Sequence, residues 1–204
     1  MGMKVKEKSA LSSEERRRLL NLLTYEKVNG KPIYYRDYKK VLKGELPPEA
    51  VMGSSELQAV IIAIILKYLF KTLPDDYIIL TNELGFIYAP KSFRSLDIAV
   101  YKKKDLLKPQ DKYTKKTPIV VIEIDTKADL SRYKNFEEYM YEKTKDLLDS
   151  GIEKVIWYIT KVKKVLIAQR QKDWITKDWV SDVEVLEGVK LNLEKLLKEE
   201  GIEI

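Results

Sequence analysis

The stretch Pro118-Ile-Val-Val-Ile-Glu-Ile-Asp-Thr-Lys127 decides the fold. Its residues 119–122 are apolar at odd and even positions alike, which predicts a strand in the middle of a sheet with both faces covered. Glu123, Asp125 and Lys127 then alternate, so they project to one side if the strand continues. Charged groups there are costly to desolvate unless they are paired or hold a metal. The stretch therefore predicts a functional site at the end of a central strand, unless the sheet ends before Glu123 and these are solvated turn residues.

Helical and strand patterns alternate on both sides of this stretch. Helices are predicted at 11–25, 34–42, 55–73 and 133–150, and further strands at 77–80, 85–89, 96–101, 154–160 and 165–169. This order predicts an α/β (α+β) fold, a mixed central sheet flanked by helices. We expect a single domain over 1–204, with an N-terminal extension at 1–52, a core at 53–170 and a C-terminal strand and helix at 171–204.

The composition excludes several classes of chemistry. The 204 residues include no cysteine and no histidine, so disulfides, thiolate metal sites and Ser-His-Asp triads are ruled out. Any catalysis must use carboxylates, lysines, tyrosines and hydroxyls. That inventory points to an oxygen-ligated ion, Mg²⁺ or Mn²⁺.

Charge and hydropathy indicate the expected surroundings. The net charge is +6, and seven lysines lie between Lys102 and Lys116, which predicts a local basic surface that attracts polyanions or is simply solvated. The most apolar run, residues 59–66, is too short to span a bilayer. The N-terminal stretch has no apolar signal-peptide core, so we expect a cytoplasmic protein with no membrane partner.

Two further charged residues interrupt apolar patterns. Asp97 is a lone carboxylate in the strand at 96–101; if this strand lies beside Glu123, the two carboxylates converge at a spacing suited to a divalent cation. Lys143 falls in the middle of the apolar stripe of the helix at 133–150, where an ammonium needs a carboxylate partner. The alternatives are a half-exposed strand for Asp97 and a lysine that reaches solvent from the helix edge.

The order of these motifs resembles a known family. Asp97, Pro118–Glu123, Lys143 eight residues before Gly151, and Ile152–Tyr158 together resemble the Uma-two family of predicted restriction endonucleases, a branch of the PD-(D/E)XK nuclease-like superfamily. The stretch Tyr25-Glu-Lys-Val-Asn-Gly30 and Gly53-Ser-Ser before the long helix agree with it. The resemblance covers about residues 24 to 170, and its specificity lies in the order and spacing of short motifs.

The resemblance implies a restriction-endonuclease-like core with an N-terminal helical extension, and a Mg²⁺- or Mn²⁺-dependent endonuclease acting on nucleic acid, with DNA the expected substrate. Asp97 and Glu123 would be the metal carboxylates and Lys143 the catalytic lysine. Cleavage of both strands would need two sites, hence a homodimer. The rival interpretation is a non-catalytic nuclease-fold module that binds nucleic acid or protein, in which Asp97 and Lys143 form a structural ion pair.

This chain departs from the family at two places. Many relatives carry serine where Asp125 stands, and histidine where the long helix here begins with Glu56 or Gln58. Asp125-Thr-Lys127 also supplies an alternative D-x-K motif. Whether Lys127 or Lys143 is the working lysine, and whether Asp125 is a third metal ligand, therefore stays open at the level of sequence.

Overall fold

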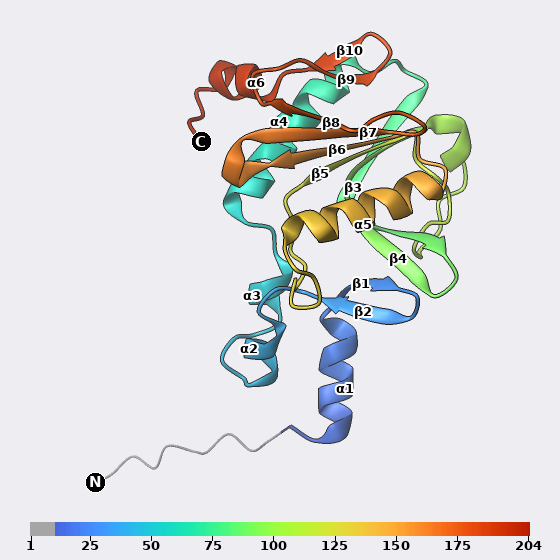
Figure 1. The fold of residues 1–204 in the computed structure, drawn as a ribbon. Coiled ribbons are helices and arrows are strands. Elements are labelled where there is room, and N and C mark those ends of the chain that lie inside the picture. Colours follow the sequence, from blue (N-terminus) through green and yellow to red (C-terminus); the bar gives the residue numbers. More distant parts are fainter. Residues whose placement is uncertain (1–10) are drawn as a thin grey trace.

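The computed structural model describes residues 11–204 and centres on one large sheet (Figure 1). Its strands are β1 (Thr24–Val28), β2 (Lys31–Tyr34), β3 (Tyr77–Ala89), β4 (Ser92–Lys102), β5 (Val120–Ile124), β6 (Lys154–Ile159), β7 (Lys164–Gln169) and β8 (Ile175–Asp178). They follow the order β2-β1-β4-β5-β6-β7-β8, and β3 also pairs with β4. Only β5 and β6 are parallel among these pairs, so the predicted mixed sheet is confirmed.

Helices cover the two faces of this sheet. One face packs under α4 (Glu56–Thr72) and α6 (Leu193–Glu199), and the other under α5 (Phe136–Asp149). The remaining elements are α1 (Ser13–Leu22), α2 (Tyr38–Leu42), α3 (Glu49–Met52), two short 3₁₀ helices (Lys103–Leu106 and Thr160–Val162) and the small sheet of β9 (Val183–Leu186) and β10 (Val189–Leu191). Within residues 11–204, no helix combines the length and apolar character needed to cross a membrane.

Strand β5 lies at the centre because both of its faces are buried. Val121 packs on the α5 side, whereas Ile122 and Ile124 pack on the α4 side, as the alternation of a strand requires. All five residues of β5 are buried. The core-strand prediction from the apolar run at 119–122 is thus confirmed.

Helices α4 and α5 each follow a residue whose side chain caps the first turn. The Ser55 hydroxyl accepts a hydrogen bond from the Gln58 amide at 3.2 Å, and the Asn135 side chain accepts one from the Glu138 amide at 2.9 Å. After α5 the chain reverses at Gly151, whose φ of 109° suits glycine. These boundaries fix which turn of each helix faces the end of β5.

Several predicted elements need correction. The helix expected at 11–25 ends at Leu22, and residues 24–34 instead form the β1–β2 hairpin, which extends the large sheet; the extension is therefore not purely helical. The expected strands at 77–80 and 85–89 form one strand, β3, interrupted where Asn82 and Glu83 have positive φ. The C-terminal part contains three strands and a helix, whereas one strand and a helix were expected. Residues 1–10 of the predicted extension lie outside the described residues.

Candidate active site

The end of β5 and the middle of α5 bring a carboxylate and a lysine together inside the protein. Lys143 is buried, and its Nζ lies 2.9 Å from Oε2 of Glu123. The same ammonium donates a hydrogen bond of 2.6 Å to the carbonyl oxygen of Ser95 on β4. Glu123 has the parity of Val121, so it faces α5. The lysine predicted on the core face therefore meets a carboxylate, as its desolvation requires.

A second carboxylate on this ammonium was missed from the sequence. Glu26 of β1 is fully buried, and its Oε1 lies 3.0 Å from Nζ of Lys143. Its other oxygen accepts hydrogen bonds from Arg94 at 2.8 Å and from the Tyr139 hydroxyl at 3.0 Å. Glu26 lies inside the Tyr25–Gly30 motif, and an Asn-Gly hairpin turn there would have placed it on a strand.

Arg94 connects this cluster to the outer side of α5. Its guanidinium is buried and bonds Glu26 on one side and Asp146 and Glu142 on the other, at 2.5 and 2.8 Å. The hairpin, β4 and α5 are thus joined through one cation. We name Glu26, Arg94, Glu123 and Lys143 the buried charge cluster.

Asp97 lies beside the cluster at the end of β5. Ile98 pairs with Ile122, so Asp97 and Glu123 come next along their two antiparallel strands. Asp97 is 4% exposed, and its Oδ2 accepts a hydrogen bond of 2.8 Å from the backbone amide of Ile124. The strand that carries Asp97 therefore lies beside the strand that carries Glu123, which is the condition on which the predicted convergence of the two carboxylates depends.

The buried carboxyl groups of Glu26, Glu123 and Asp97 differ in the direction of their pKa shifts, which are set by burial and by nearby positive charge. Burial raises the pKa of Glu26, but the charges of Lys143 and Arg94 outweigh it, so the pKa falls below its usual value. For Glu123 and Asp97 burial dominates, and the pKa of each carboxyl is raised despite the charge of Lys143. Burial alone would lower the pKa of Lys143, but Glu123 and Glu26 raise it, so the ammonium stays protonated.

Asp125 and Lys127 follow the end of the strand, so the condition for them to share one side with Glu123, a strand that continues, is not met. Strand β5 ends at Ile124, and Asp125 has a φ of 50° that breaks the alternation. The Asp125 carboxylate accepts hydrogen bonds from the backbone amide and hydroxyl of Thr160, at 2.9 and 2.5 Å. Lys127 forms an ion pair with Glu83, and burial lowers the pKa of Lys127 to about 8.

The residues present fit a hard divalent cation. Within residues 11–204 no three side chains of the Asp, Glu, His or Cys type gather as a ligand set, so the oxygens would come from Asp97, Glu123 and the Ile124 carbonyl, with waters completing the shell. Oε1 of Glu123 is buried and lacks a hydrogen-bond partner. A buried carboxylate oxygen of that kind is costly unless a proton, a water or a cation meets it.

Two cavities border this place. A cleft of about 680 Å³ is lined by residues that include Arg36, Gln58, Lys127 and Lys161. A smaller cavity of about 390 Å³ reaches Asp97 and shares Lys127 with the first. None of the seven lysines of the basic loop, Lys102 to Lys116, lines either cavity.

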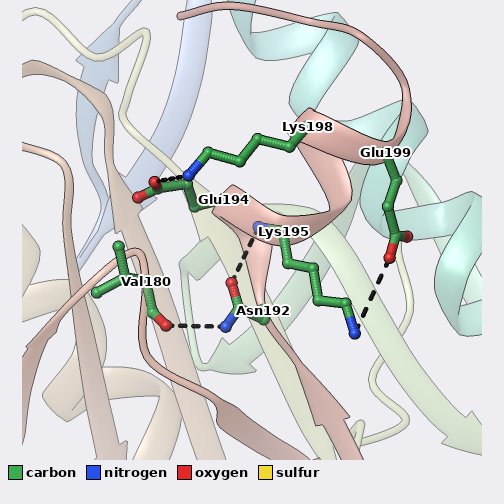
Figure 2. A pocket seen from close by; sticks show the side chains of 6 residues that line it. All are labelled: Val180, Asn192, Glu194, Lys195, Lys198 and Glu199. Atoms are coloured by element: carbon green, nitrogen blue, oxygen red, sulfur yellow. Dashed lines mark hydrogen bonds and ion pairs between the residues drawn. The ribbon is translucent and has the colours of Figure 1, made fainter.

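A third hollow, on α6, has a different character (Figure 2). Lys198 is bonded to Glu194 at 2.6 Å, Lys195 lies 3.9 Å from Glu199, and the Asn192 amide donates to the Val180 carbonyl at 2.8 Å. The charged groups drawn there are paired with one another along the helix surface. This hollow is therefore a solvated helix face.

Comparison with known proteins supports the fold. No protein-family profile matches the chain, and no curated protein is similar in sequence. A solved structure described as a "putative nuclease belonging to DUF820", from Anabaena variabilis ATCC 29413, superposes with a TM-score of 0.58 over 85% of this chain and 89% of that one, at 13% sequence identity. The chain therefore has the fold of that structure.

Proposed function

We propose that this protein is a metal-dependent nuclease of the Uma-two type that hydrolyses phosphodiester bonds, with DNA as the expected substrate. The observation that carries the proposal is the pair of buried carboxylates, Asp97 and Glu123, beside an ammonium at the end of a central strand. Two of their properties support a cation there: the raised pKa of each carboxyl and the partnerless Oε1 of Glu123. The nuclease fold of the DUF820 structure agrees with this chemistry.

Each residue has a definite task in this proposal. Asp97, Glu123 and the Ile124 carbonyl would hold Mg²⁺ or Mn²⁺, which supplies polarisation of the scissile phosphate and a water of lowered pKa. Lys143 is a permanent cation, held between Glu123 and Glu26. It offsets negative charge that develops on the phosphate, and it does not act as a base because its pKa is raised.

Lys127 is the alternative catalytic lysine, and two observations support a role for Lys127 in the site. It lines both cavities, and its pKa of about 8 allows it to lose a proton near neutral pH. Its ammonium is paired with Glu83, whereas the ammonium of Lys143 is paired with Glu123 itself. We therefore assign the main electrostatic role to Lys143 and expect Lys127 to affect binding of substrate in the cleft.

The substrate would approach through the cleft of about 680 Å³. Arg36, Lys127 and Lys161 supply positive charge along its wall and would contact phosphate groups, which makes binding weaken as salt increases. Two copies of the protein would be needed to cut both strands of a duplex. We propose a homodimer on that ground.

Nicking of supercoiled plasmid DNA tests the proposal. The wild-type protein should nick plasmid with Mg²⁺ or Mn²⁺ and stop when EDTA is added, whereas Asp97→Asn and Glu123→Gln should lose activity by at least about 100-fold. Lys145→Ala is the matched control, because Lys145 lies on α5 but is exposed and paired with Asp149. Circular dichroism should show that each variant is folded. Equal nicking by wild type and Glu123→Gln would refute the proposal.

A non-catalytic module is the second candidate. The observation that favours it is the burial of the charge cluster, since ion pairs of this kind also serve fold specificity alone. Such a module should retard DNA in gel shifts with or without divalent cation and leave the plasmid intact. The two candidates are therefore separated by the same assay with a binding measurement beside it.

A further inference from the structure

Gln58 lies at the first turn of α4 and reaches across to the end of β5. Gln58 is 5% exposed, and the hydroxyl of Ser55 caps the helical turn that carries it. Nε2 of Gln58 donates to the Ile124 carbonyl at 3.0 Å, and it lies 3.3 and 3.4 Å from the two carboxylate oxygens of Asp97. One amide nitrogen therefore contacts three of the oxygens that the proposed function gives to a cation.

A neutral amide does not do the electrostatic work of a cation. The NH₂ group supplies two donors, but it brings no net charge to balance Asp97 and Glu123. Its bonds to Asp97 are also long for N–H···O bonds, and such contacts are weak. The pKa of Asp97 remains raised with this amide in place. The contact is thus easily given up when a stronger partner competes for the same oxygens.

The other end of the same side chain is a good metal ligand. Glutamine carbonyl oxygens coordinate Mg²⁺ and Ca²⁺ beside carboxylates. The terminal torsion of glutamine is broad and roughly two-fold, so the amide can exchange its two ends with little strain. Gln58 lines the cleft of about 680 Å³, which gives the amide room on one side.

We propose that Gln58 is a two-state ligand of this site, and the inference rests on the proposed function. In the protein without a divalent cation, Nε2 bonds Asp97 and the Ile124 carbonyl and holds α4 against β5. When the cation binds, the amide turns and its Oε1 joins Asp97, Glu123 and the Ile124 carbonyl as an oxygen ligand. Cation binding is thereby coupled to the first turn of α4.

Two substitutions that keep the approximate shape of the Gln58 side chain distinguish the role of the NH₂ group as a donor from the role of the oxygen as a ligand. In Gln58→Glu a carboxylate faces Asp97, so the EDTA-treated protein should melt at a lower temperature than wild type. The added carboxylate should tighten Mn²⁺ binding by roughly tenfold, because the number of charged ligands tunes affinity in such sites. Gln58→Met removes both donor and ligand, and it should weaken Mn²⁺ binding by roughly tenfold because the lost ligand outweighs the lost weak bonds.

Isothermal titration calorimetry with MnCl₂ and melting curves in EDTA measure both effects. Glu56→Gln is the control, since Glu56 is an exposed carboxylate on the same turn and its loss should leave Mn²⁺ affinity unchanged. Tighter Mn²⁺ binding by Gln58→Met would show that the amide only competes with the cation, which overturns the ligand assignment. Unchanged affinity in both Gln58 variants would overturn the proposal entirely.

Failure of this inference is distinguishable from failure of the proposed function. If wild type binds Mn²⁺ and Glu123→Gln does not, the cation site stands whatever the Gln58 variants do. If wild type and Glu123→Gln titrate alike, the site itself is wrong, and the two-state assignment of Gln58 falls with it.

Discussion

The buried charge cluster around Lys143 and the paired charges on α6 use the same residue types at similar distances. Lys143 lies 2.9 Å from Glu123, and Lys198 lies 2.6 Å from Glu194. The side chains of the first pair are 1% exposed each, whereas those of the second are 73% and 34% exposed. The shorter contact is therefore the one in solvent. Figure 2 draws this pair on α6.

The comparison shows that the distance between two charged groups does not by itself indicate how much their ion pair stabilises the fold. Water screens the α6 pair and competes for both of its partners, so pairs of this kind contribute little. In the buried cluster each charge has been desolvated, and removal of one member leaves its partner without compensation. The cluster thus makes the fold sensitive to single substitutions at positions that also belong to the candidate site.

Lys143→Met should produce the largest effect. The thioether keeps most of the volume of the stem but leaves Glu26 and Glu123 without their shared ammonium, which should destabilise the protein by about 3–5 kcal/mol. Urea unfolding followed by tryptophan fluorescence measures the change. A loss below about 1 kcal/mol would mean that the cluster is no more important than a surface pair.

Glu26→Gln should have an intermediate effect that depends on pH. The lowered pKa of Glu26 means that its charge stabilises the fold above the ordinary glutamate value of 4.5, and this stability is lost as the pH falls through the folded-state pKa. At pH 7 the variant should lose about 1.5–3 kcal/mol, the range for a hydrogen bond to a charged group. Below pH 4.5 the two proteins should converge in unfolding free energy. A constant gap from pH 7 to pH 3 would contradict this account of Glu26.

Lys198→Ala should have the smallest effect, because its partner Glu194 stays hydrated without it. The unfolding free energy should change by less than about 1 kcal/mol, and the difference should shrink further in 0.5 M salt. A loss comparable with that of Lys143→Met would remove the distinction between the two regions.

The sequence predicted one half of the buried cluster well. Lys143 was found because a lysine in the middle of an apolar helical stripe has few physical explanations, and Glu123 because it ends a strand with two apolar faces. Glu26 was missed because residues 24–34 resembled the end of a helix followed by a turn, and a hairpin's place beside β4 is set by long-range pairing. Asp125 does not continue the alternation of β5, because the strand ends at Ile124 and Asp125 has a positive φ.

The direct test of the central claim is a calorimetric titration of wild type and Glu123→Gln with MnCl₂. We predict saturable binding by wild type and a loss of at least about tenfold in affinity for Glu123→Gln, because the substitution removes a charged oxygen ligand. Identical titrations, or no heat of binding for wild type at millimolar Mn²⁺, would contradict a cation site formed by Asp97 and Glu123.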